Sequence, residues 1–429
     1  MATIEETDED AADAPARRKP ARLLLRNRDY TGWWIGETVS QYGSALSTVA
    51  YPLLILAATG SAAQAGVVTA ASSIGLLATM LIGGALADRF SRRTLLIAGP
   101  LIQAVVVGTV VLAVATGHVS VLYVAAVGFV QGMVGGASGA AAFATLRRVV
   151  PQEQLPTAFA QMQGRTMAVR LAGPTSGGFL FGIARWVPFL GDALSFLLSA
   201  GGAALIRRPL GPDPEELTPH ELVFGAIAEG FRYIRGNAYL RFLTAWAALA
   251  NATMSGLNLL VIVLIHDRHG SAVLIGAVTS LGAAGGLIGA FLSRRIAQRV
   301  KGRLLVIAVS WMAAGVIAGL AFIPNPWLIG LLLALLMVLI APLNVVFSTY
   351  EARSIPDALM GRVSSAIDFG AASIRWAGPL GAGWLAASCG ATWATLVFGG
   401  VQGGIAISTL IARGLYVLNE PIDEVVAEA

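Results

Sequence analysis

Long apolar stretches recur along the whole chain and are separated mostly by short polar loops. Each stretch is long enough to cross a hydrocarbon layer of ~30 Å as a helix, because a helix rises ~1.5 Å per residue. Strands of a membrane barrel would alternate apolar and polar residues, and these stretches do not alternate. The predicted spans are 31–57, 63–87, 94–116, 119–146, 157–182, 187–206, 239–265, 271–293, 304–323, 327–350, 360–387 and 390–413. The pattern predicts an all-α polytopic membrane protein with twelve transmembrane helices.

The only long connection, residues 207–238, joins the sixth and seventh spans. It begins as a charged, proline-rich segment and then becomes amphipathic. Phe224, Ile227, Phe231 and Ile234 fall on one helical face, opposite Glu221, Glu229, Arg232 and Arg235. This pattern predicts a helix that lies at the membrane surface. The expected domains are a disordered tail (1–20), a six-helix bundle (21–206), the linker (207–238), a second six-helix bundle (239–416) and a cytoplasmic tail (417–429).

Basic residues are divided unevenly between the alternate loops. If both ends of the chain are cytoplasmic, the inner loops and tails hold 24 of the 29 Lys and Arg residues. The outer loops then hold only Arg185 and Arg268, and Arg165, Arg170 and Arg375 fall within predicted spans. Loops that stay in the cytoplasm are the ones enriched in Lys and Arg. We therefore expect a multi-pass protein of the plasma (inner) membrane with both termini cytoplasmic.

The two halves of the chain carry an internal repeat at an offset of 205 residues. Arg148-Val-Val-Pro matches Arg353-Ser-Ile-Pro, and Arg170-Leu-Ala-Gly-Pro matches Arg375-Trp-Ala-Gly-Pro. A third match pairs the motif that begins at Gly84 with residues 289–294. An offset of six helices makes this a parallel repeat, of a kind that transporter folds often contain. We expect two six-helix bundles related by pseudo-twofold symmetry about the membrane normal.

Composition excludes several other classes of protein. Only 12% of residues are charged, about half the share in soluble proteins, so most of the surface is expected to face lipid. The basic residues follow the membrane and are no sign of nucleic-acid binding. A single cysteine, Cys389, excludes an internal disulfide and argues against a cysteine metal site. No G-K-[ST] sequence is present, so a nucleotide-driven pump is not expected. We expect no enzyme activity, no cofactor, no metal and no catalytic residue.

Polar residues recur at helical spacing within the predicted spans. They lie on the first, fourth, seventh and tenth spans, with a further pair on the fifth. The positions are Glu37, Gln41, Ser44 and Thr48, then Gln131 and Ser138, then Gln161 and Arg165, then Asn251, Ser255 and Asn258, and finally Asn344, Ser348 and Glu351. Polar groups within a membrane are costly and usually face a cavity or one another. The candidates for a substrate cavity are Gln41, Ser44, Gln131, Arg165, Asn251, Asn258 and Asn344.

Two carboxylates are candidates for binding a transported proton. Glu37 is the first, since a carboxyl partly removed from water can change charge as its access alternates, and Gln41 stands one turn away. A permanently paired, structural Glu37 is the alternative. Asp368 is the second candidate, near the inner end of its helix, where a solvated or gate residue is the alternative. Arg170 and Arg375 are open to two interpretations: structural arginines that hold a closed state together, or recognition of an anionic or catechol-like substrate.

The segment from Gly84 to Arg93, G-A-L-A-D-R-F-S-R-R, resembles the loop between helices 2 and 3 of the major facilitator superfamily, with Ser91 in place of a glycine. The resemblance implies a cavity lined by helices 1, 4, 7 and 10, and a gate role for Asp88, which would cap a second-half helix near Gly361. It also implies that the repeated Arg-x-x-Gly-Pro segments lie where the bundles meet. The gate and seam candidates are Gly84, Asp88, Arg89, Arg92, Arg93, Arg170, Gly173, Pro174, Gly177, Gly178, Arg375, Gly378 and Pro379.

The segment 170–178 resembles the helix-5 pattern of antiporters in that family, which is associated with exporters, although Val169 replaces its first glycine. The arginine usual in helix 4 is also absent, since Gly128 holds that place, so the family's usual antiport machinery does not transfer intact. Segments 33–41, 49–56, 151–156 and 192–200 are similar to the enterobactin-exporter and macrolide-efflux branch.

The resemblance implies alternating-access export of small amphipathic molecules, such as a drug, siderophore or secondary metabolite, by proton antiport. The expected partners are a small-molecule substrate, protons and the lipid bilayer, and the protein is expected to be a monomer. The alternatives are an uptake symporter or uniporter of the same superfamily and, in another class, a transport-inactive scaffold or sensor.

Overall fold

We describe residue 24 and residues 27–80, 91–206 and 221–419 of a computed structural model, and within these the chain is helical with no strand. The first bundle contains α1 (Arg28–Thr59), α2 (Ala62–Met80), α4 (Arg92–Ala115), α5 (Val121–Val149), α6 (Leu155–Ile183) and α7 (Val187–Ala204). The second contains α9 (Ala238–Asp267), α10 (Ala272–Arg299), α11 (Gly302–Leu320), α12 (Pro326–Ser354), α13 (Met360–Ala372), α14 (Ala377–Cys389) and α15 (Ala391–Ile411). A further helix, α8 (Glu221–Gly236), precedes the second bundle.

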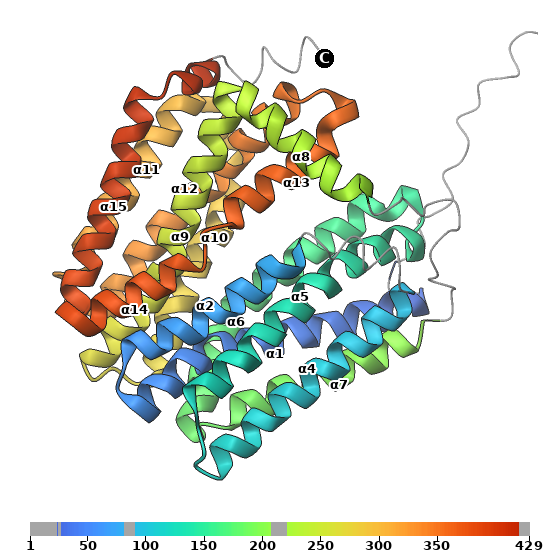
Figure 1. The fold of residues 1–429 in the computed structure, drawn as a ribbon, viewed down its shortest axis with the longest axis vertical. Coiled ribbons are helices and arrows are strands. Elements are labelled where there is room, and N and C mark those ends of the chain that lie inside the picture. Colours follow the sequence, from blue (N-terminus) through green and yellow to red (C-terminus); the bar gives the residue numbers. More distant parts are fainter. Residues whose placement is uncertain (1–23, 25–26, 81–90, 207–220, 420–429) are drawn as a thin grey trace, which may run out of the picture.

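Ten of the described helices are long and apolar enough to cross a membrane. Helix α6 and the broken pair α13–α14 complete two sets of six (Figure 1). Polar residues at the loop ends fix several helix starts. The Asn237 side chain accepts hydrogen bonds from the first backbone N–H groups of α9, and Asn325 does the same for α12. Such caps satisfy N–H groups that have no partner within the helix. The fold predicted from the apolar pattern is confirmed.

The eleventh span differs from its prediction as one continuous helix, because residues 373–376 form a turn between α13 and α14. The indole N–H of Trp376 donates to the Ser373 carbonyl at 2.9 Å, so the Ala377 N–H bonds to Ile374 instead, three residues back. The Gly378 N–H likewise bonds three residues back, to the Arg375 carbonyl, and Pro379 has no N–H with which to form the bond after that. In the first-half copy of this motif Leu171 replaces the tryptophan, and α6 continues through Pro174 unbroken.

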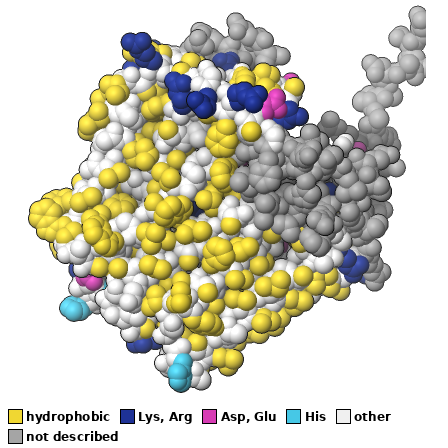
Figure 2. Space-filling view, in the orientation of Figure 1, with side chains coloured by type: hydrophobic (Ala, Val, Ile, Leu, Met, Phe, Trp, Pro, Cys, Tyr) yellow, Lys and Arg dark blue, Asp and Glu magenta, His cyan; other side chains and the backbone are white. Residues whose placement is uncertain are grey.

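The two ends of the molecule differ in charge. We call the end that carries α8 the basic end; it holds Arg93, Arg148, Arg299, Lys301, Arg303 and Arg413. The other end, which we call the opposite end, holds Arg185, Arg268 and the histidines His118, His266 and His269. Figure 2 shows Lys and Arg gathered at one end and histidine at the other, with a broad apolar surface between them. That band is the surface expected to face lipid.

The bundles are joined at the opposite end and separate toward the basic end (Figure 1). One apolar core cluster at the opposite end contains residues of both bundles, such as Leu53 of α1, Leu260 of α9 and Ala382 of α14. At the basic end each bundle has its own core instead. Trp33 belongs to the core of the first bundle and Tyr350 to that of the second. The described residues of the two bundles therefore share a core at the opposite end and have separate cores at the basic end.

Candidate functional site

Helix α1 carries a carboxylate and an amide that contact each other. The side-chain N–H of Gln41 donates to Glu37 Oε1 at 3.0 Å, and both residues are half-buried. Glu37 lies about two and a half turns from the start of α1, on the basic-end side of the apolar cluster that joins the bundles. Its position thus gives a hydrogen-bonded carboxylate in the part of the molecule where the bundles separate.

Arg165 of α6 is almost completely enclosed within the first bundle. Only 5% of its surface is exposed, and its Nε and Nη1 groups are buried without a hydrogen-bond partner. Glu37 and Tyr30 of α1 are close enough for their charges to act on it. The Tyr30 hydroxyl donates to Gln161 Oε1 at 2.8 Å, one turn from Arg165. Arg165, predicted from the sequence to line a cavity, therefore lies where α6 faces α1.

The first bundle also buries a carboxylate that the sequence analysis did not select. Asp192 of α7 is 0% exposed and accepts hydrogen bonds from Ser47 Oγ at 2.6 Å and Ser44 Oγ at 3.4 Å, both on α1. Gln131 of α5 is its third side-chain partner. Among the described residues, no Lys, Arg or His forms an ion pair with Asp192. Tyr51 of α1 is the titratable group beside it.

Close packing of α7 on α1 holds Asp192 in this place. A Cβ atom at Gly43 would overlap the Ser195 hydroxyl and would lie 3.0 Å from the Asp192 Cα. A lone carboxylate in an apolar span is costly, and that cost alone could have marked Asp192 as a candidate in the sequence. Ser44 and Gln131, two residues predicted for a substrate cavity, are partners of this carboxylate.

The polar residues of the second bundle are more open. Asn251, Asn258, Asn344 and Asp368 are all exposed. The side-chain amide of Asn251 donates to the Ala371 carbonyl at 3.1 Å, and that of Asn258 donates to Met254 within α9. Such bonds to backbone carbonyls leave the amide oxygens available to other groups. Among the described residues, Asp368 forms no ion pair with an arginine.

The seam between the bundles is made by glycine and proline. A Cβ atom at Gly276 of α10 would overlap the carbonyl oxygen of Pro174 in α6, and one at Gly66 of α2 would overlap that of Pro379 in α14. The Thr175 hydroxyl donates to the Ser280 hydroxyl across the same seam at 2.8 Å. Gly178 also lies here, against α10.

Other predicted seam residues pack within one bundle. Gly173 and Gly177 lie against α1, and Gly378 lies against α9. Arg92 begins α4 and is buried, and Arg93 donates to the Ala204 carbonyl of α7 at 3.0 Å. The gate candidates Gly84, Asp88 and Arg89 lie outside the described residues.

Arg170 and Arg375 stand at matching places on either side of the seam. Each lies four residues before the seam proline of its own bundle, on the basic-end side, and each is exposed. Arg375 belongs to the turn between α13 and α14. The two guanidinium groups are close enough for their charges to repel.

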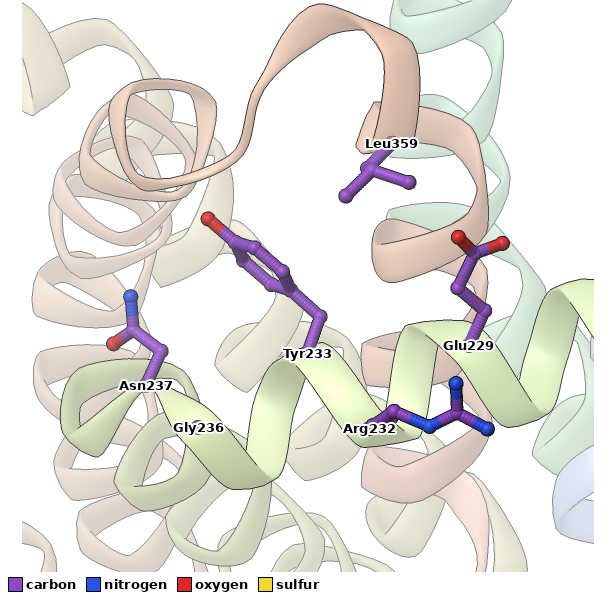
Figure 3. A pocket seen from close by; sticks show the side chains of 6 residues that line it. All are labelled: Glu229, Arg232, Tyr233, Gly236, Asn237 and Leu359. Carbon is purple, nitrogen blue, oxygen red and sulfur yellow. The ribbon is translucent and has the colours of Figure 1, made fainter.

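A surface pocket of about 540 Å³ lies apart from these residues, at the basic end (Figure 3). It is lined by Glu229, Arg232, Tyr233, Gly236, Asn237 and Leu359. The Tyr233 hydroxyl donates to the Ser354 carbonyl at 2.7 Å, and Glu229 forms an ion pair with Arg362 of α13. These contacts fasten α8 to the second bundle.

Comparison with known proteins places this architecture in a family. Residues 33–379 match the family described as Major Facilitator Superfamily. The chain belongs to the major facilitator superfamily. The resemblance drawn from the loop motif and from the repeated Arg-x-x-Gly-Pro segments is thereby confirmed. Members of this superfamily and the relatives named below are transporters, and the chain is a multi-pass membrane protein of that kind.

Curated relatives within the superfamily are named as efflux proteins. The chain is 29% identical over 390 residues to the multidrug efflux pump Tap of Mycobacterium bovis and Mycobacterium tuberculosis, covering 85% of this chain and 88% of the relative. It is 24% identical over 349 residues to the enterobactin exporter EntS of Escherichia coli, covering 80% of this chain and 81% of the relative.

Solved structures support the major facilitator fold. The nucleoside transporter NupG matches with a TM-score of 0.71 at 12% identity, covering 91% of this chain and all of that one. A bacterial homologue of the iron transporter ferroportin, in an inward-facing state, matches with a TM-score of 0.68 at 16% identity, covering 90% of this chain and 99% of the other. At these identities the likeness concerns the fold alone.

Proposed function

We propose that this protein exports small amphipathic molecules across the plasma membrane in exchange for protons. In this proposal the protein works as a monomer, and its basic end and both termini face the cytoplasm. The names of the relatives support the direction of transport, since both are described as efflux or export proteins. The excess of Lys and Arg at one end supports the orientation. The end at which the two bundles have separate cores then faces the cytoplasm, the side from which an exporter takes up its substrate.

One observation carries the proton-coupled part of the proposal: Glu37 is half-buried, hydrogen-bonded to Gln41 and close to the enclosed Arg165. A carboxylate in this position offsets the charge of Arg165. Its protonation removes that offset and leaves an enclosed cation uncompensated, which is unfavourable in a medium of low dielectric constant. The proton on Glu37 is therefore linked energetically to any movement that changes the surroundings of Arg165.

Asp192 is a second candidate for the proton site, favoured by its complete burial. It is held by hydroxyl and amide groups and, in the described part of the chain, by no cation. Transfer of an unpaired carboxylate into such surroundings is costly, so binding a proton relieves that cost. Ser44 and Gln131, which are only partly buried, connect Asp192 to the side of α1 that carries Gln41.

The transport cycle follows from these two sites and the seam. A substrate enters between the bundles from the basic end, and the bundles then close there and part along the seam at the opposite end. Access to the proton site changes with this movement. Coupling requires that the protonated and the substrate-bound protein favour different states, because a ligand shifts an equilibrium only by its differential affinity.

Direction of transport separates this proposal from its alternatives. We would reconstitute the purified protein and also prepare inside-out and right-side-out membrane vesicles. Accumulation of the fluorescent probes dansylglycine and dansylglycinamide would be measured with a proton gradient, without one, and with a protonophore. Gradient-dependent accumulation in inside-out vesicles supports export. Accumulation only in right-side-out vesicles indicates an uptake symporter, and gradient-independent equilibration indicates a uniporter. No flux in any preparation that retains folded protein favours a scaffold or sensor.

A further inference from the structure

We propose that Arg170 and Arg375 form a two-arginine site that binds the carboxylate, or an equivalent oxyanion, of the exported molecule. The preferred substrates are then amphipathic anions that bridge the two bundles. This inference rests on the proposed function, since it names the chemical class of its substrate. It assigns to the two arginines a ligand-binding role instead of a structural one.

The position of the pair is set by the internal repeat. Arg170 precedes Pro174 by four residues in α6, and Arg375 precedes Pro379 by four residues in the second bundle. Both prolines touch the facing bundle through their carbonyl oxygens. The arginines therefore lie about one turn from the closed seam, on the side where the bundles separate. In the proposed export, a molecule that enters from the basic end meets this pair before it reaches the core that the two bundles share.

The two charges have no counter-charge in the described residues. Neither guanidinium forms an ion pair or a side-chain hydrogen bond within residues 27–80, 91–206 and 221–419. The charge that acts on Arg375 is that of Arg170, and no carboxylate offsets it. Glu37 is held by Gln41 instead. Both guanidinium groups are exposed and close enough to repel each other, and two neighbouring cations without a counter-charge form an attractive site for an anion.

Arginine chemistry defines the group that fits. The guanidinium is planar and presents its N–H donors as a fork that matches the two oxygens of a carboxylate. Two such forks, one from each bundle, can hold one oxyanion from both sides. Leu171, which is exposed, and Trp376, which is half-buried, follow the two arginines directly and supply apolar surface for the rest of an amphipathic ligand.

An anion in this place also acts on the conformation. With the site empty, repulsion between the guanidinium groups opposes a closer approach of the bundles on the basic-end side of the seam. A bound carboxylate removes that repulsion and attracts both arginines. Occupancy then favours closure of the basic end, which is the movement that an exporter requires after it has taken up its substrate.

The direct test is equilibrium binding to the purified full-length protein in lipid nanodiscs, without a proton gradient. Dansylglycine and dansylglycinamide form a matched pair that differs in a carboxylate against a neutral amide. We expect wild type to bind the acid about tenfold more tightly than the amide. Arg170→Gln and Arg375→Gln should each remove most of this preference and leave amide binding within about twofold. Arg185→Gln, at the opposite end, is the charge-matched control and should retain the preference.

Several outcomes would overturn the inference. Equal affinity of wild type for acid and amide would do so, as would a loss of preference in Arg185→Gln equal to that in the two test variants. If inorganic phosphate displaced the acid at the concentration at which the acid itself binds, the pair would be a site for small inorganic anions and the substrate claim would fail. If a Gln variant does not fold, Arg170→Lys and Arg375→Lys keep the charge without the fork, and they should lower the preference for the acid.

Failure of the anion site can be told apart from failure of the proposed export function, because the binding experiment does not depend on transport. Vesicles that export dansylglycinamide under a proton gradient, together with nanodiscs that show no preference for the acid, would reject the anion site alone. Nanodiscs that prefer the acid in an arginine-dependent way, together with vesicles that transport neither probe, would reject the proposed export and keep the site.

Discussion

Where α7 packs on α1, the first bundle buries Asp192, and where α15 packs on α9, the second bundle buries Phe398 against Gly256. Both contacts join the first and last helices of a bundle. In one bundle a carboxylate and two hydroxyl groups fill the contact, and in the other an aromatic ring fills it. Repeated backbone architecture therefore does not require repeated chemistry.

The same contrast recurs at positions related by the 205-residue offset. Gln131, a partner of Asp192, corresponds to the fully buried Leu336. Arg165, enclosed near Glu37, corresponds to Gly370, which packs against Thr244. At these places the first bundle holds an amide and a cation, whereas the second holds a leucine and a glycine. Among the described residues, Asp192 of the first bundle is buried, and no Asp or Glu of the second bundle is.

The bundles remain alike where they meet. Arg170 and Arg375 occupy equivalent positions, and each is followed by a Gly-Pro pair whose proline touches the other bundle. A shared interface needs matching surfaces from both halves, so the repeat has kept these residues. In the proposed mechanism, proton binding belongs to the first half, and the arginine pair bridges both halves.

A carboxylate placed at position 398, where α15 packs on α9, should have the largest effect on the stability of the protein. In Phe398→Asp a carboxyl replaces a ring that is 8% exposed and that packs against Gly256. An unpaired buried carboxyl and the lost packing should together cost at least ~3 kcal/mol. We expect little monodisperse protein after extraction, and a much lower melting temperature for what remains. Phe398→Leu is the control, and a Phe398→Asp protein as stable as this control would contradict the account.

Loss of the Ser47 hydroxyl, which donates to Asp192, should have an intermediate effect on the free energy of unfolding. Ser47→Ala removes the 2.6 Å hydrogen bond to Asp192, at an expected cost of ~1–2 kcal/mol. Thermal unfolding of Ser47→Ala, Asp192→Asn and the double variant forms a double-mutant cycle. Ser310→Ala in the second bundle, which removes a partner of Trp246, is the matched control. Additive effects of Ser47→Ala and Asp192→Asn would mean that the two residues do not act together.

Removal of an exposed ion pair at the surface of the second bundle should have the smallest effect on the free energy of unfolding. Glu229 and Arg362 form an ion pair with side chains 43% and 50% exposed, so water screens the attraction between them. Glu229→Gln should lower the free energy of unfolding by less than ~0.5 kcal/mol. The melting temperature should stay close to that of wild type at both low and high salt. A larger loss, removed by salt, would show that charge at the linker helix stabilises this bundle more than the account allows.

Much of this arrangement follows from the sequence, because it depends on periodic patterns. The apolar runs predict the helices, the offset of 205 predicts the two bundles, and the positions of Arg170 and Arg375 predict where the halves meet. The break at residues 373–376 was missed, because the same Pro motif leaves α6 continuous and only the Trp376 side chain differs.

The candidate site was less predictable, since it depends on which helix faces which. Spacing places Gln161 and Arg165 on one face of α6, but it does not say that this face packs on α1. Asp192 was missed because it lies alone in an apolar helix and gains its partners, Ser44 and Ser47, only through the fold. Burial of an isolated charge is set by tertiary packing, which periodicity does not describe.

The central claim is that protons couple to transport through the first bundle. Its most direct test is gradient-driven accumulation of dansylglycine in inside-out vesicles by wild type, Glu37→Gln, Asp192→Asn and, as the second-bundle control, Asp368→Asn. We predict that at least one of the two first-bundle variants loses the response to the proton gradient while it still equilibrates the probe. Asp368→Asn should keep that response. Loss of the response in Asp368→Asn, with both first-bundle variants unchanged, would contradict the account.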